Sequence, residues 1–116
     1  MAAVAMALPI LPGKLESWRR GMDEQTGSRW AAGGAARRRW GVTRERIWLQ
    51  QTPTGNIEII LLETDDPARM FQEIATSQES FEVWLRQFVL ENLGIDLTQT
   101  MPGPPPELIL DWSADQ

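Results

Sequence analysis

The stretch Val42–Asp65 contains two runs rich in Ile, Leu, Trp and Thr, separated by Pro53-Thr54-Gly55-Asn56. These residue types favour a pleated, half-buried strand, and Pro, Gly and Asn together are typical of a tight turn. The pattern therefore predicts a β-hairpin. A loop of Thr54-Gly55, or of all four turn residues, pairs Trp48 with Leu61, whereas a turn on Gly55-Asn56 would pair Trp48 with Glu63.

Both faces of this hairpin are apolar, because side chains alternate between the two faces along a strand. One face is aliphatic and comprises Ile47, Leu49, Ile60 and Leu62. The other comprises Trp48, Ile59 and Leu61, together with Arg44, Arg46 and Glu63. A sheet with one face in water shows a cleaner alternation of apolar and polar residues. Both faces are therefore expected to be covered.

The N-terminal residues 1–11 are also apolar and predict a strand from Ala3 to Ile10 that Pro12-Gly13 ends. One face of this strand consists of Val4, Met6, Leu8 and Ile10, and the other of the small Ala3, Ala5 and Ala7. The segment lacks a basic start and is too short to cross a bilayer. We therefore expect neither a signal sequence nor a membrane span.

Helical periodicity follows this first strand. Leu15, Trp18 and Met22 recur at spacings of three and four residues and predict one helix. A second helical piece is predicted from a cap at Ser28 to a stop at Gly41. Glycine lowers helix stability by roughly 1 kcal/mol relative to Ala, so we expect a kink or loose turn at Gly33-Gly34.

Helical signals return after the hairpin. Asp66-Pro67 is a typical helix start. Thr76 and Glu79 form a possible capping box, which predicts that a further helix starts near Ser77, and Leu93-Gly94 ends it.

The C-terminal part holds a Pro-rich connector at residues 101–106 and then ELILDW at residues 107–112. Leu108, Leu110 and Trp112 share one side of this last segment, which predicts a final strand. The predicted order is β-α-β-β-α-β in a single domain spanning residues 1–116. It is an α+β fold with a four-stranded antiparallel sheet and helices on one face.

Composition limits the chemistry that such a domain can perform. The chain has 116 residues, 42% of them apolar, and contains no Cys and no His. This excludes thiolate and Ser-His-Asp nucleophiles and nearly all zinc or copper sites, so we expect no metal and no cofactor. Carboxylates, Arg, Lys, hydroxyls and Trp remain. The absence of Cys fits a cytoplasmic protein.

Charge is unevenly distributed along the chain. Residues 14–46 contain nine basic and four acidic side chains, and residues 57–116 contain two basic and twelve acidic ones. Arg37, Arg38 and Arg39, with Trp30 and Trp40 as stacking platforms, suggest nucleic-acid binding as one hypothesis. The chain is acidic overall, with a net charge of −5. Since a run of Arg is usually a solvated helix end, we do not expect a nucleic-acid partner.

The element order and the segment LPGKLESWRR, in which Pro12-Gly13-Lys14 leads into a helix with Trp18, resemble the ferredoxin-like subunits of the dimeric α/β-barrel superfamily. The antibiotic-biosynthesis monooxygenases belong to it. The resemblance implies a sheet-to-sheet homodimer and a ligand cleft between sheet and helices. Members that degrade haem or act as haem peroxidases use a His ligand, which this chain lacks. That activity is therefore not expected.

Two functional hypotheses follow from the resemblance and the residues. The first is a homodimer that binds a small apolar molecule in a pocket bounded by Trp18, Ala3, Ala5 and Ala7 and closed by Trp84. The second is a cofactor-independent monooxygenase or isomerase in which Glu63, Glu45 or Arg46 handles protons. A buried carboxylate with a raised pKa in the cleft would favour the second hypothesis.

The dimer is expected to form through one face of the sheet. A single layer of helices covers only one side of a sheet, and the aliphatic face matches the helix stripes better. Trp48, Ile59 and Leu61 then face outward as the predicted interface.

Overall fold

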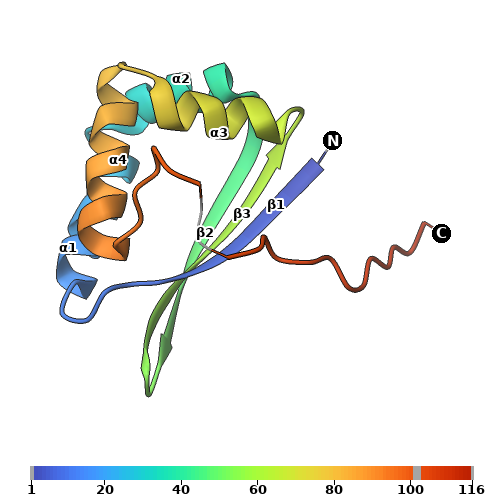
Figure 1. The fold of residues 1–116 in the computed structure, drawn as a ribbon, viewed down its shortest axis with the longest axis horizontal. Coiled ribbons are helices and arrows are strands. Elements are labelled where there is room, and N and C mark those ends of the chain that lie inside the picture. Colours follow the sequence, from blue (N-terminus) through green and yellow to red (C-terminus); the bar gives the residue numbers. More distant parts are fainter. Residues whose placement is uncertain (1, 101–102, 116) are drawn as a thin grey trace.

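The computed structural model describes residues 2–100 and 103–115. In this part of the chain the elements are β1 (Ala2–Pro9), α1 (Leu15–Thr26), α2 (Trp30–Trp40), β2 (Val42–Thr52), β3 (Gly55–Thr64), α3 (Pro67–Thr76) and α4 (Ser80–Leu93), as shown in Figure 1. The strands form one antiparallel sheet with the order β1-β3-β2. The predicted α+β class is confirmed.

The β2–β3 hairpin turns on Pro53-Thr54, because Thr52 pairs with Gly55. Proline is favoured at the second position of such a turn and glycine at the fourth. Trp48 accordingly pairs with Ile59, so the predicted pairing with Leu61 is wrong by two residues. An even shift leaves every side chain on its face, and the predicted division of the hairpin into two faces is confirmed.

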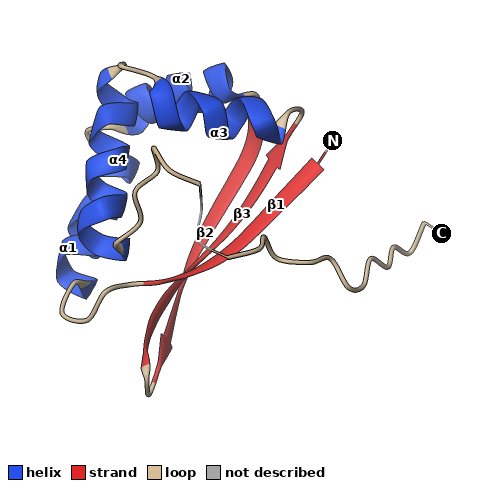
Figure 2. Cartoon of the chain, viewed as in Figure 1, coloured by secondary structure: helices blue, strands red, loops and turns tan. Residues whose placement is uncertain are grey.

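All four helices of the described chain lie on one side of the sheet (Figure 2). Two buried clusters connect them to it. The first joins Ile60 and Leu62 of β3 to Ala36, Trp40, Met70 and Phe81. The second joins Trp18 of α1 to Ile10, Phe88, Val89 and Leu93. Ile47 of β2 packs against both clusters, which places the aliphatic face of the hairpin under the helices, as predicted.

Helix α2 runs without a break through Gly33-Gly34, so the predicted kink is wrong. The reason is packing against α4: a Cβ on Gly33 would lie 3.1 Å from Cε1 of Phe81. The missing side chain lets the two helices approach closely, and burial of the Phe81 ring offsets the poor helix propensity. Arg29 occupies the N-cap position, so the predicted Ser28 cap is also wrong.

The helices after the sheet begin and end largely as expected. Asp66 caps α3, with its Oδ1 accepting a hydrogen bond from the Arg69 backbone N at 3.1 Å. Thr76 is the last residue of α3 and α4 begins only at Ser80, so the predicted capping box is wrong. Gly94 ends α4 with a φ of 70°, a left-handed conformation that glycine adopts without strain.

The fourth strand predicted at residues 107–112 is absent from the sheet of the described residues. This segment pairs with no strand and is exposed. Residues 101 and 102 of the predicted connector lie outside the described residues, and Pro104, Pro105 and Pro106 have no backbone N–H to donate to a sheet. A local strand pattern predicts an extended backbone but does not determine whether, or with which strand, the segment pairs.

Among the described residues, no helix is long and apolar enough to cross a membrane.

Candidate functional site

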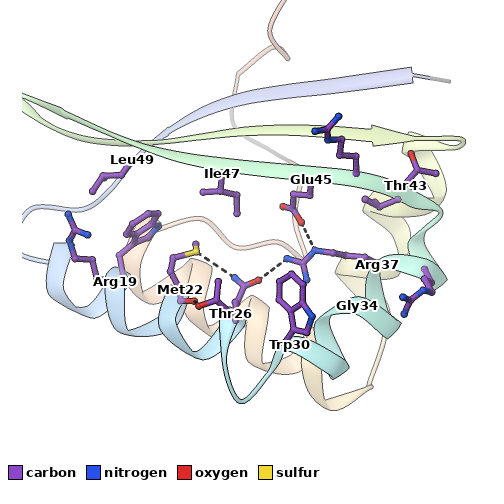
Figure 3. A pocket seen from close by; sticks show the side chains of 15 residues that line it. Arg19, Met22, Thr26, Trp30, Gly34, Arg37, Thr43, Glu45, Ile47 and Leu49 are labelled. Carbon is purple, nitrogen blue, oxygen red and sulfur yellow. Dashed lines mark hydrogen bonds and ion pairs between the residues drawn. The ribbon is translucent and has the colours of Figure 1, made fainter.

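A groove with a volume of about 720 Å³ lies between helices α1 and α2 and strand β2 (Figure 3). Three elements line it because each turns one periodic set of side chains towards it. Helix α1 contributes Trp18 and Met22, which are four residues apart, and β2 contributes Ile47 and Leu49, which are two apart. These four side chains form an apolar surface along the groove.

A polar cluster crosses the middle of the groove (Figure 3). Arg37 Nε donates to Glu45 Oε1 at 2.5 Å, and Arg37 Nη2 donates to Gln25 Oε1 at 2.7 Å. Both Arg37 and Glu45 have side chains that are mostly buried. The cluster fixes the orientation of one charged pair within an otherwise apolar wall, and such placed polar groups give a ligand site its specificity.

Glu58 of β3 lies behind this wall. It pairs with Leu49 across the hairpin and is only 3% exposed. Trp18 Nε1 donates to Glu58 Oε1 at 2.5 Å. Glu58 also lines a smaller cavity of about 90 Å³, whose walls share Met22, Gln25, Arg37, Glu45 and Ile47 with the groove. The carboxyl group is therefore separated from the groove by a single layer of side chains.

The protonation of Glu58 is controlled by this position. Burial raises its pKa from 4.5 to about 7, because a charged carboxylate loses its hydration there. The hydrogen bond from Trp18 acts in the opposite direction, and the nearby charge of Glu45 adds to the increase. Near neutral pH this carboxyl group exchanges between its acid and base forms, as a general acid or base requires.

The structure separates the residues of the predicted pocket. Trp18 lines the groove, but Ala3, Ala5 and Ala7 pair with Glu63, Leu61 and Ile59 on the other face of the sheet. Trp84 stacks on Phe88 within the helix layer, with ring centroids 5.2 Å apart. The predicted pocket geometry is therefore wrong. The bulkier side chains of β1, and not its alanines, face the helices.

The three residues predicted to handle protons lie on different faces of the sheet. Glu45 reaches the groove, whereas Glu63 and Arg46 belong to the outer face of the sheet. Glu58 was not anticipated. The signal was present in the sequence, because Glu58 alternates with Ile60 and Leu62 and so occupies a charged position on the aliphatic face.

The predicted interface residues Trp48, Ile59 and Leu61 lie on the outer face, which the helices leave open. Trp48 pairs with Ile59, and Leu61 follows two positions further along β3.

The run Arg37–Arg39 does not form an open basic patch. Arg37 is bound to Glu45, and Arg39 Nη2 contacts both carboxylate oxygens of Glu82, at 2.8 and 2.9 Å. Trp40 is 2% exposed and donates its Nε1 to Glu82, so it offers no stacking platform. Trp30 is 68% exposed and lines the groove with Arg38, so the hypothesis of a nucleic-acid interface now depends on these two residues alone.

Within the described residues, no group of three or more Asp, Glu, Cys or His side chains could hold a metal ion.

Comparisons of the chain with protein-family models, curated proteins and solved structures give no significant match. The groove, Glu58 and the surfaces of the sheet are therefore the features of the chain that indicate a function.

We predict that replacing Glu58 with Gln changes how stability depends on pH. Because the pKa of Glu58 is raised in the folded state, folding favours its acid form. The contribution of Glu58 to the free energy of unfolding is then complete below pH 4.5. It decreases by roughly 3 kcal/mol as the pH rises to about 7. Gln keeps an acceptor for Trp18 but cannot ionise. The free energy of unfolding of the variant, relative to the wild type, should therefore rise over this interval.

Urea denaturation followed by Trp fluorescence at several pH values measures this difference. Glu91→Gln, at a largely exposed position, is the matched control and should show little change with pH. A wild-type minus Glu58→Gln difference that is the same at pH 4.5 and pH 8 would contradict the prediction.

Proposed function

We propose that this protein binds a small, largely apolar molecule in the groove between α1, α2 and β2. The observation that carries the proposal is the groove itself, whose volume of about 720 Å³ falls in the range of small-molecule sites. Its wall of Trp18, Met22, Ile47 and Leu49 would hold the apolar body of the ligand.

The charges around the groove favour a ligand that also carries an anionic group. Arg19 and Arg38 line the groove, and neither has a carboxylate partner among the described residues. Arg37 is already neutralised by Glu45. An amphipathic anion, such as an aromatic carboxylate or sulfonate, would combine apolar contact with one of the unpaired guanidinium groups.

The proposal predicts that filling the groove weakens binding of 1-anilinonaphthalene-8-sulfonate, an apolar aromatic anion. Gly34 lines the groove, and a Cβ there would have only Arg38 Nη1 nearby, at 3.5 Å. Gly34→Leu should fold normally and bind the dye about tenfold more weakly, a loss of about 1.4 kcal/mol. Fluorescence titration measures the affinity.

Ala35→Leu is the matched control, because Ala35 is exposed on the same helix and does not line the groove. Equal dye affinity in the two variants would place the dye elsewhere. Native mass spectrometry of freshly purified protein would then identify any molecule carried through purification, and its displacement by the dye would test whether both share the groove.

We also propose that the protein is a homodimer that joins two sheets through their outer faces, as in the dimeric α/β-barrel superfamily. Supporting this, the helices cover the inner face alone, and Trp48 on the outer face is 46% exposed. Ala3, Ala5 and Ala7 lie exposed on the same face and would let a second sheet approach closely. A stable interface would bury roughly 800 Å² per subunit.

The dimer proposal predicts that Leu61→Glu yields monomer or insoluble protein. The substitution would bury an unpaired carboxylate in the interface at a cost of several kcal/mol. Gln72→Glu adds the same charge at an exposed position of α3 and should leave the dimer intact. Light scattering measures the mass. A monomeric wild type, or an unchanged dimer of Leu61→Glu, would refute the assignment of this face.

A second candidate function is a cofactor-independent enzyme of the isomerase or monooxygenase type. The specific observation in its favour is Glu58, a buried carboxyl with a pKa near 7 directly behind the groove. If the activated C–H of the ligand reaches the smaller cavity that Glu58 lines, the Glu58 carboxylate would accept the proton there and leave an enolate. Returning the proton to a different carbon would complete an isomerisation.

This second function predicts proton exchange that depends on Glu58. In D₂O, the protein should speed deuterium incorporation into activated C–H compounds, such as 1,3-diketones, as measured by NMR. The rate should rise with pH through a midpoint near 7, where Glu58 ionises. Glu58→Gln should reduce exchange to the rate without protein. Equal rates for wild type and Glu58→Gln would remove this candidate.

A further inference from the structure

The C-terminal segment at residues 107–112 exposes an unusual amount of apolar surface. Leu108, Ile109, Leu110 and Trp112 are 76%, 81%, 80% and 75% exposed. The segment belongs to no helix or strand, and the structure gives residues 107–112 no hydrogen bond to the other described residues. Four large apolar side chains within six residues are costly to leave in water. The segment therefore has the properties of a strand without a partner.

An unused strand edge exists in the same molecule. β1 occupies one side of the sheet and pairs with β3 alone among the described residues, so its outer edge carries free backbone donors and acceptors. At eight residues it is long enough to pair with the whole of residues 107–112. Such an edge binds an additional extended chain through main-chain hydrogen bonds, and alternate side chains of that chain provide specificity.

The direction of the chain favours the β1 edge of another copy. In Figure 1 the C-terminal segment runs away from the helices and the sheet to an isolated end. Pro104, Pro105 and Pro106 stiffen the chain immediately before it and favour an extended conformation. A stiff, extended arm that points outward reaches a neighbouring molecule more readily than it folds back.

Charge complementarity also points to a second copy. The segment and its flanks carry Glu107, Asp111 and Asp115 and no basic residue. The outer face of the sheet carries Arg44 and Arg46, which have no ion-pair partner among the described residues. Because β1 and β2 are opposite edges of the sheet, these charges would favour association of the two copies through long-range attraction and would not pair directly with an arm on β1.

We propose that residues 107–112 of one copy add to the free edge of β1 of a second copy, so that the two copies exchange a fourth strand. This inference rests on the proposed homodimer and adds to it a reciprocal arm. Leu108, Leu110 and Trp112 would then share one face of the enlarged sheet, and Ile109 and Asp111 the other. The apolar arm and the open outer face would be buried in a single assembly.

The test uses the absence of Cys from the chain, which lets single cysteines be placed without background. Ala5→Cys labels the middle of β1. Ile109→Cys and Leu110→Cys label opposite faces of the arm, so one of them must share the face of Ala5. The Ala5→Cys protein is mixed with each arm variant and treated with a short bis-maleimide. The expected product is a covalent dimer that contains one chain of each variant, formed strongly with one arm variant.

Gln51→Cys, at the exposed tip of the hairpin, replaces the arm cysteine in the control mixture. A chain carrying both Ala5→Cys and the reactive arm cysteine distinguishes exchange from pairing within one chain, because exchange links two chains and pairing within a chain leaves a monomer. Linkage within single chains, or linkage no stronger than with Gln51→Cys, would overturn the proposal.

The outcome is independent of the test of the sheet interface. Wild-type dimer in light scattering without arm linkage would refute strand exchange and leave the outer-face dimer standing. Wild-type monomer would refute both. Deleting residues 107–116 should weaken the dimer, measured as a higher protein concentration at half dissociation, and should leave dye binding in the groove unchanged. An unaltered dissociation midpoint after this deletion would also count against the exchanged strand.

Discussion

One layer of helices lies on a sheet whose two faces are both apolar, and this imbalance governs the rest of the structure. The helices bury the face with Ile60 and Leu62 in a continuous core. The opposite face carries Trp48 and the alanines of β1 and has no cover among the described residues. Since a sheet separates its two faces completely, no adjustment of the helices can cover the second one. Cover for that face would require a further layer packed directly on it.

Two buried carboxyl groups, Glu82 of α4 and Glu58 of β3, have pKa values shifted in opposite directions because their surroundings differ. Burial acts to raise the pKa of Glu82, but hydrogen bonds from Arg39 and Trp40 outweigh it and hold the pKa below its usual value. Glu82 therefore stays ionised and ties α4 to α2. Glu58 has a hydrogen bond from Trp18 but no ion-pair partner among the described residues, so burial dominates and its pKa rises to about 7. Of the two, only Glu58 remains able to exchange a proton near neutral pH.

The sequence was sufficient for those features that depend on local periodicity. The two faces of the hairpin were predicted correctly even though its register was not, because an even shift preserves the alternation. The Asp66 cap and the Gly94 stop were also predicted, since each depends on a few adjacent residues. The unbroken helix at Gly33 was not, because its cause is the ring of Phe81, a residue distant in the sequence.

The candidate site depended on information that local patterns do not contain. The alternation in β1 shows that Ala5 and Met6 face opposite sides, but not which side the helices cover. Choosing the wrong side placed Ala3, Ala5 and Ala7 in a pocket that the structure forms elsewhere. Glu58 could have been found as a charge on an aliphatic strand face, yet its contact with Trp18 joins residues forty positions apart. Hydrogen bonds of that range become visible only once the tertiary structure is known.

Strand β2 contributes alternate side chains to the groove and to the outer face of the sheet. In β2, Ile47 and Leu49 face the groove, and Trp48 between them faces outward. Any partner that packs on Trp48 therefore restrains the backbone that holds the apolar wall of the groove. Glu58 and Ile59 have the same relation in β3, where one residue is buried behind the groove and the next pairs with Trp48. Covering the outer face would thus limit the motion of the very residues that a ligand, or a proton acceptor, needs held in place.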